Sequence, residues 1–400
     1  MHISEASNSS GSVSEFILLG FPSRREIQIL LCVMFSLIYL LTLLGNAAII
    51  CAVWSSRKLH TPMYILLANF SFLDICYVSS DVPKMLANII SQTKSISYAG
   101  CLLQFYFFFS MCAAEGYFLS AMSFDRFLAI CRPLHYPTIM TYQLCARLVV
   151  FCWAGGFLSI LMPAVLMSRV PFCGPNVIDH FFCDLGPLLA LSCAPVPKTT
   201  LTCATVSSLI IFITFLYILG SYTLVLRAVL RVPAGSGRNK AFSTCASHFL
   251  VVSLFYGSVM VMYVSPGSRS HPGTQKFVTL FYCMATPFFN PLIYSLRNKD
   301  MKDALKKVLC ASEISKNTEK WYTFLHHYSL KNSEFLSFKK TIFWSCLSIW
   351  LLNLIKVWFI THTKKLSSYL KRKYPQFQRS IAAKFHRVFI YQCINTISMF

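Results

Sequence analysis

Residues 29–54, ILLCVMFSLIYLLTLLGNAAIICAVW, decide the fold, and they contain no charged side chain. A helix needs roughly 20 mainly apolar residues to cross about 30 Å of hydrocarbon, and this stretch is long enough. Six further stretches of the same kind occur before residue 300, at approximately 63–83, 102–124, 147–167, 199–226, 242–264 and 277–296. The sequence therefore predicts an all-α membrane protein, a bundle of seven transmembrane helices.

The composition agrees with this prediction. Of the 400 residues, 56% are hydrophobic and only 12% are charged, too few to cover the surface of a soluble domain. A formal net charge of +22 is common among nucleic-acid-binding proteins. Here, however, the basic residues lie in short loops and in a C-terminal tail, where they orient the chain in a membrane. We therefore expect membrane lipid as a partner and no nucleic acid.

The basic residues also predict the orientation of the chain. With the N-terminus outside, the cytoplasmic loops hold Arg57, Lys58, Arg132, Arg147, Arg227, Arg231, Arg238 and Lys240. Because cytoplasmic loops are enriched in Lys and Arg, we expect a multi-pass protein of the plasma membrane with an extracellular N-terminus. Residues 1–28 are then an extracellular segment and 29–296 the transmembrane domain. Asn8 begins an Asn-Ser-Ser sequence in that segment and is a candidate glycosylation site.

The chain after the seventh stretch has two parts. Residues 297–310 predict a short amphipathic eighth helix along the cytoplasmic face, and Cys310 is a candidate palmitoylation site. Residues 311–400 form an atypical extension with fourteen Lys and Arg against three Asp and Glu. We expect it to be cytoplasmic or poorly folded. Residues 341–360 are apolar enough for an eighth span, but an interfacial segment agrees better with the charges that follow it.

Four polar side chains lie at mid-span depth, where ionisable groups are costly and often functional. They are Asp74, Glu115, Asn46 and Asn290. Two carboxylates and amides, with the Thr286 hydroxyl, suit a hard monovalent cation or a shared proton. The candidate is a sodium ion at Asp74, Glu115 and Asn290, and otherwise we expect no cofactor. A water-filled hydrogen-bond network that only holds the helices together is the alternative, and the sequence leaves both open.

Two segments at the predicted inner ends of helices indicate a conformational switch. Asp125 and Arg126 end the third span, where the arginine can pair with its neighbour and later release it. Pro291, in the segment from Asn290 to Tyr294, removes a backbone hydrogen bond and permits the seventh helix to kink.

With these residues the chain resembles the odorant receptors of the rhodopsin-like (class A) G-protein-coupled receptor family, in their tetrapod-type branch. The matching segments are 45–46 (GN), 59–64 (LHTPMY), 122–131 (MSFDRFLAIC), 133–136 (PLHY), 221–222 (SY), 240–248 (KAFSTCASH) and 287–298 (PFFNPLIYSLRN). They occur in the family's order over residues 16–310. Tyr222 joins the switch residues through this resemblance. The family has tyrosine at Phe127, so a hydroxyl is missing at the face that meets the G protein.

The resemblance also implies disulfide bonds and a ligand pocket. Cys101 is expected to bond Cys183, and Cys173 to bond Cys193. His180 with Cys183 is a conceivable soft-metal site, but an oxidised Cys183 argues against it. The implied odorant pocket consists of Phe108, Phe109, Cys112, Ala113, Val206, Ser207, Ile210, Tyr256 and Tyr263. Mostly apolar walls with a few hydroxyls suit a small volatile molecule.

The sequence therefore predicts an odorant receptor that activates an olfactory-type stimulatory G protein and raises cyclic AMP. A channel or transporter that uses Asp74 and Glu115 is the alternative, although the chain shows no internal repeat. A receptor-derived product whose tail prevents surface delivery is a third possibility. We do not expect an enzyme, because no nucleophile–base set or phosphate loop is evident.

Overall fold

The computed structural model describes the backbone of residues 13–21, 24–91, 93–173, 176–231, 236–264, 276, 279–297 and 299–313. Side chains at 236–244, 260–264, 295–299 and 309–313 are outside this description, as are Asn8 and residues 314–400. The glycosylation site, the Cys310 side chain and the C-terminal extension therefore remain predictions.

Every predicted span lies in a helical segment, as far as the structure describes its residues. The helices are α1 (Arg25–Ser55), α2 (Pro62–Ile90), α3 (Tyr98–Cys131), α5 (Tyr142–Met167), α7 (Pro197–Arg231), α8 (Ser236–Val264) and, for the seventh span, η2 (Phe281–Ala285) followed by α10 (Thr286–Arg297). In the described residues, α1, α2, α3, α5 and α7 are long and apolar enough to cross a membrane, and α8 contains a shorter apolar stretch, Cys245–Val259. The predicted seven-helix bundle is confirmed.

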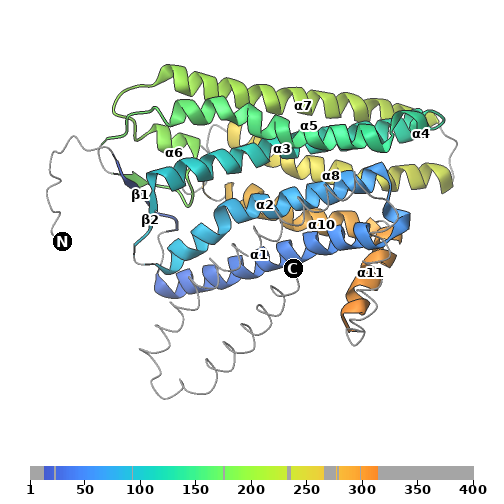
Figure 1. Ribbon diagram of the computed structural model, residues 1–400, viewed down its shortest axis with the longest axis horizontal. Helices are drawn as coiled ribbons and strands as arrows, with labels where there is room; N and C mark the ends of the chain where they lie inside the picture. The colour runs from blue at the N-terminus through green and yellow to red at the C-terminus, as the bar shows by residue number, and fades with distance from the viewer. Residues whose placement is uncertain are drawn as a thin grey trace, which may run out of the picture. The chain divides into compact units, whose positions relative to one another are not determined.

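Helix α3 lies at the centre of this bundle. It packs against α2, α5, α7 and α8, whereas α1 packs against α2 and α10 (Figure 1). The helix begins after Ser97, whose hydroxyl accepts a hydrogen bond from the N–H of Gly100 at 3.1 Å. Its central position explains why so many of its side chains are buried while one face of α1, α5 and α7 is apolar and exposed. Those exposed faces are the surfaces that meet lipid.

A small sheet closes the end of the bundle that holds the N-terminal segment, here called the N-terminal end. Strand β1 (Glu15–Leu18) lies between β2 (Ser95–Ser97) and β3 (Val177–Ile178). It pairs antiparallel with β2 and parallel with β3. Phe16 and Leu18 alternate inward and are fully buried. These strands are a departure from a purely helical expectation, because the spans give no sign of them.

Short helices complete the described chain. They are η1 (Arg57–Leu59), α4 (Tyr136–Ile139), α6 (Leu185–Leu189) and α11 (Lys299–Glu313). Helix α11 corresponds to the predicted amphipathic helix and packs against α1 and α10. Met301 and Ala304 are buried on one side, whereas Lys302, Lys306 and Lys307 are exposed. The helix continues to Glu313, three residues beyond its predicted end at Cys310.

Helices α3 and α5 approach each other closely at Gly156. A Cβ atom there would lie 2.6 Å from the carbonyl oxygen of Ser110 and 2.7 Å from the Cβ of Ala114. Both neighbours belong to the core or the backbone of α3 and cannot move aside cheaply. The two helices therefore depend on a residue without a side chain at this position.

We predict that Gly156→Ala destabilises the bundle by about 1–3 kcal/mol, because the added methyl forces α5 away from α3. The measurement is thermal unfolding of the purified protein in detergent. Gly257→Ala is the matched control, since its Cβ would meet no atom within 4 Å and alanine favours helix. Equal melting temperatures for the two variants would contradict the prediction.

Candidate functional site

At the end of the bundle that holds α11, Asp125 and Arg126 form an ion pair. The Arg126 guanidinium donates through Nε and Nη2 to Oδ2 of Asp125, at 3.0 and 2.5 Å. The second carboxylate oxygen, Oδ1, accepts from the Tyr136 hydroxyl of α4 at 2.8 Å. Burial and this carboxylate raise the pKa of Tyr136, so its hydroxyl stays a donor. Asp125 is fully buried with both oxygens engaged. The pair is therefore in a closed arrangement.

Tyr136 lies in a segment that the family resemblance includes, but the sequence assigned it no role. The same holds for His248 of α8. Its Nδ1 lies 2.5 Å from the hydroxyl of Tyr222 in α7, and the two rings stack at 5.6 Å. This contact joins the ends of α7 and α8 that lie beside Arg126. Phe127 packs against the adjoining apolar cluster of Val225, Val229 and Cys245.

The proline inside the seventh helix has a partner in α1. Pro291 has no N–H, so the carbonyl of Pro287, four residues earlier, loses its helical donor. Asn46 supplies one instead, donating from Nδ2 to that carbonyl at 3.2 Å. Gly45 lies directly against Pro291, since a Cβ there would be 3.2 Å from the proline Cβ. The Gly45–Asn46 pair therefore fits the interrupted helix both sterically and chemically.

The predicted mid-membrane residues are buried close together. Asn290 Nδ2 donates to Oδ2 of Asp74 at 2.9 Å, and Glu115 interacts electrostatically with Asp74. Several buried oxygens have no hydrogen-bond partner among the described residues: Oδ1 of Asn46, Asp74 and Asn290, Oε1 of Glu115 and Oγ1 of Thr286. Within the described chain, no group of three or more His, Cys, Asp or Glu side chains could hold a metal ion. Two carboxylates with amide and hydroxyl oxygens fit a hard monovalent cation better than a transition metal.

The residues of the implied odorant pocket divide into two groups. Phe108 is buried and contacts Tyr77 of α2 at 4.9 Å and Phe182 at 4.5 Å, so it faces α2 and the loop. Tyr256 of α8 is also buried and donates to the hydroxyl of Thr214 in α7 at 2.7 Å. Both groups of that bond lie 3.6 Å from where a Cβ of Gly116 would be. The sequence analysis selected neither Tyr77 nor Thr214 for the pocket.

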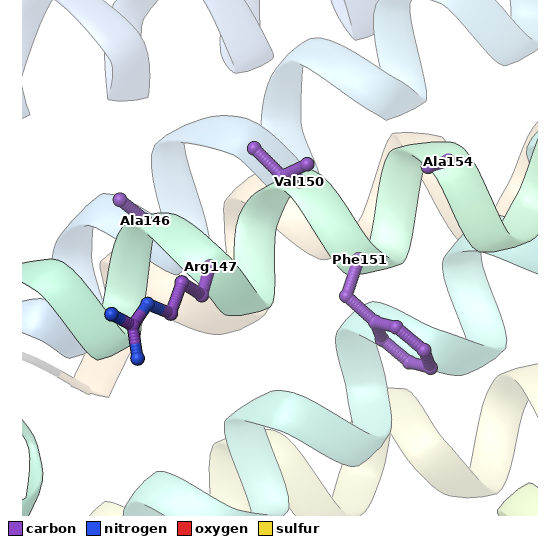
Figure 2. Close-up of a pocket in the computed structure, with 5 residues that line it drawn as sticks. All are labelled: Ala146, Arg147, Val150, Phe151 and Ala154. Carbon is purple, nitrogen blue, oxygen red and sulfur yellow. The ribbon is translucent and has the colours of Figure 1, made fainter.

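The remaining pocket residues lie on inward or partly buried faces. Ala113 is buried, and Phe109, Cys112, Val206, Ser207 and Ile210 are partly buried. The side chain of Tyr263 lies outside the described residues. A different, shallow groove occurs on the outer face of α5, where Ala146, Arg147, Val150, Phe151 and Ala154 follow one another at helical spacing (Figure 2). Val150 and Phe151 are 63% and 61% exposed, so this groove belongs to the lipid-facing surface.

The loop of residues 168–196 is fixed across the N-terminal end. The structure contains both disulfide bonds that the resemblance implies, Cys101–Cys183 and Cys173–Cys193. The N–H of Cys183 donates to Oε1 of Gln104 in α3 at 3.1 Å. Lys276 donates to Asp179 in the loop and to the carbonyl of Gly20. Since Cys183 is oxidised, it has no thiolate to share with His180 in a metal site.

His180 belongs to this loop and is buried against Phe181 and Phe182. Its ring centroid lies 4.5 and 4.8 Å from theirs, and neither ring nitrogen has a partner among the described residues. Burial lowers the pKa of His180 to about 3, with Lys276 adding to the effect and Asp179 opposing it. Burial raises the pKa of nearby Asp184 to about 6. The imidazole is therefore neutral at physiological pH.

Comparison with known proteins gives the family. The olfactory receptor family model matches residues 35–312. Olfactory receptor 11H6 of Homo sapiens is 64% identical over 297 residues, which cover 74% of this chain and 90% of that receptor. The chain belongs to the olfactory receptor family. Olfactory receptor 11G2 of Homo sapiens is 61% identical over 307 residues, covering 77% and 89% of the two chains.

A solved structure supports the fold. Squid rhodopsin aligns with a TM-score of 0.58 and 16% identity, over 72% of this chain and 82% of that one. The olfactory receptor is thus a multi-pass membrane receptor with a rhodopsin-like fold, and it is not an enzyme. Its family senses odorants through G proteins.

The pH dependence of stability tests the environment of His180. In the unfolded chain the imidazole takes up a proton as the pH falls through about 6.5, whereas in the folded chain it does so only near pH 3. Between these two values the unfolded state binds more protons than the folded state. The free energy of unfolding therefore decreases as the pH falls, by up to about 1.4 kcal/mol per pH unit. We predict that His180→Leu removes this loss between pH 6 and 4, measured by thermal unfolding at each pH.

Asp184 has the opposite effect on the free energy of unfolding. Because its pKa is raised, the folded chain binds a proton there before the unfolded chain does, as the pH falls through about 6. That contribution is common to the wild type and the variant, so the difference between their pH slopes isolates His180. Parallel curves for the two proteins would show that His180 is not buried as described.

Proposed function

We propose that this olfactory receptor lies in the plasma membrane with its N-terminus outside and raises cyclic AMP through an olfactory-type stimulatory G protein. The Lys and Arg residues of the loops at the α11 end support this orientation. The observation that carries the signalling proposal is the buried Asp125–Arg126 pair with Tyr136 as its third member. An arginine held by a neighbouring carboxylate at the cytoplasmic end of α3 is a group that a partner protein can compete for.

The closed pair corresponds to a resting state. An odorant shifts the receptor only if it binds the open state more tightly than the closed one. A ligand that separates the ends of α3 and α8 changes the surroundings of the Tyr222–His248 contact, which joins α7 to α8 beside Arg126. Separating Arg126 from Asp125 exposes the guanidinium of Arg126. Carbonyl and carboxylate groups of the G protein then accept the hydrogen bonds that Asp125 accepted in the closed state.

The ligand is a small volatile molecule bound in the half of the bundle nearer the N-terminal end. The Tyr256–Thr214 hydrogen bond provides hydroxyl groups between α7 and α8, and Gly116 leaves room beside them on α3. The walls are otherwise aromatic and aliphatic, which suits a weakly polar ligand. Tyr256 lies on the same helix as His248, two turns away, so a ligand at this position acts on the helix that moves.

The function is tested by measuring cyclic AMP in cells that express the receptor and the olfactory G protein, over a broad odorant panel. Surface expression of the receptor is measured in parallel. The full chain is compared with one stopped after Cys310, because the family match ends at residue 312. We expect a ligand response in both, and none in Arg126→Ala at equal surface expression. Silence of both chains across the panel, at normal surface level, would contradict the proposal.

We further propose that a sodium ion binds at Asp74, Glu115 and Asn290. The unpartnered oxygens around Asp74 support it, since a cation would satisfy acceptors that otherwise face one another. We predict that the purified receptor melts at a higher temperature in sodium chloride than in choline chloride at equal ionic strength, and that Asp74→Asn abolishes the difference. The same difference in both proteins would favour the alternative, a hydrogen-bond network without an ion.

A further inference from the structure

Asp81 of α2 is a second buried acid, two helical turns from Asp74 in the direction of the N-terminal end. Its exposed fraction is 1%, and neither Oδ1 nor Oδ2 has a hydrogen-bond partner among the described residues. The N–H groups of Asp81 and Val82 lie near the carboxylate, but both belong to the backbone of the helix. Asp74 has the amide of Asn290, whereas no comparable side chain of the described residues bonds Asp81. An isolated carboxyl group in this environment is costly and calls for a ligand or partner.

The surroundings of Asp81 contain further polar groups. Tyr39 of α1 and Cys283 of η2 both interact electrostatically with it, so three helical segments meet around the carboxylate. The Tyr39 hydroxyl lies 2.9 Å from that of Ser79. Pro83 has no N–H to give to the carbonyl of Ser79, four residues earlier, which leaves another acceptor in the same turn of α2.

Segment η2 is a π-helix, and this is an independent indication of a site. It covers Phe281–Ala285, directly before α10. A π-helical turn widens the helix and interrupts its regular hydrogen bonds, and such turns are frequent at functional sites. Cys283 lies in the middle of this turn, and its electrostatic partners include both Asp81 and Asp184. The widened turn thus faces two carboxyl groups, one from α2 and one from the loop.

The cations near this end are engaged elsewhere. Among the described residues, Lys84 donates to the carbonyl of Ser95, Lys94 to that of Leu19, and Lys276 to Asp179. His180 is neutral, since burial lowers its pKa to about 3. Asp184 accepts a hydrogen bond from the N–H of Leu185 and has no cation beside it in the described chain. Among the described residues, therefore, neither Asp81 nor Asp184 has a cationic side chain bonded to it.

An aromatic path joins this region to the proposed odorant pocket. Tyr77 lies one turn before Asp81 on α2, and its ring packs 4.9 Å from that of Phe108. Phe108 also lies 6.3 Å from Tyr282, the neighbour of Cys283. The hydroxyl of Tyr77 lies beside the thiols of Cys112 and Cys283. A ligand whose apolar part lies against Phe108 and Tyr77 can thus direct a polar end to Asp81.

We propose that Asp81 binds the ammonium group of a small protonated amine, whose hydrocarbon part packs against Tyr77 and Phe108. An ammonium has three N–H donors and a positive charge, which match two free carboxylate oxygens and a neighbouring carbonyl. Asp184 adds negative charge from the loop side. This inference rests on the proposed odorant function for the position of the ligand, but it names a chemical class that the apolar pocket alone does not require.

The test is ligand-dependent thermal unfolding of the purified full chain in detergent at pH 7.4, with hexylamine and 1-hexanol as probes of equal length. We expect hexylamine to raise the melting temperature of the wild type and hexanol to have at least tenfold lower apparent affinity. Asp81→Asn should weaken hexylamine at least tenfold and leave hexanol unchanged. Glu26→Gln, an exposed acid in the first turn of α1, is the matched control and should change neither.

A second probe keeps the proposal testable if the Asp81 variant does not fold. Hexyltrimethylammonium carries the charge but no N–H donor, so the wild type should bind it at least tenfold more weakly than hexylamine. Equal stabilisation by the amine and the alcohol, or no effect of Asp81→Asn on hexylamine, would overturn the proposal. So would absence of any stabilisation by hexylamine.

These outcomes are separate from those of the cyclic AMP experiment, because the binding measurement needs no G protein. Amine binding through Asp81 in a receptor that is silent in cells would contradict only the signalling proposal. A response to neutral odorants without amine binding would contradict only the role of Asp81.

Discussion

Hydrocarbon offers no hydrogen-bond partner to a backbone N–H or C=O, and the interior of this receptor is arranged around that constraint. Each crossing has to be helical, and each proline inside a helix leaves a carbonyl that another group must satisfy. Pro291 does so in α10, and Asn46 of α1 donates to the carbonyl that it leaves. Pro83 does so in α2, where the carbonyl of Ser79 lies in the same turn as Asp81. Polar side chains thus gather where the helices are interrupted.

The polar groups differ in how completely they are satisfied. At the α11 end, both oxygens of Asp125 are engaged, and Tyr222 is bonded to His248. In the middle of the bundle and towards the N-terminal end, oxygens of Asp74, Glu115 and Asp81 have no partner in the described chain. A satisfied network is stable as it stands, whereas unpartnered acceptors gain most from a cation or an ammonium. Ligand binding and signalling can therefore occupy opposite ends of one bundle. The unpartnered buried acceptors, which a ligand would stabilise, lie towards the ligand-binding end.

The fold was predictable because length and apolar composition suffice to identify spans, and the adjacent Asp125 and Arg126 can pair whatever the tertiary structure. The role of Tyr136 was not, since it reaches Asp125 from a separate helix eleven positions later. The three short strands gave no signal, because β1, β2 and β3 have only four, three and two residues. Asp81 was missed because the sequence shows which polar groups exist but not which of them bond to one another. That its carboxylate is buried without a hydrogen-bond partner among the described residues is visible only in the structure.

Phe108 illustrates why the pocket residues could be listed but not arranged. Its position in α3 was assigned together with residues of α7 and α8, yet its ring faces Tyr77, Phe182 and Tyr282. The loop holds Phe182 there, because the adjacent Cys183 is bonded to Cys101 and donates its N–H to Gln104. Gln104 in turn donates to the carbonyl of Ser80 in α2. Loop, α2 and α3 are consequently fixed to one another on this side, whereas Tyr256 and Thr214 connect α7 and α8 on the other. A ligand that spans both sides would contact a rigid wall and a movable one, and only its contacts with the movable wall can distinguish the closed state from the open one.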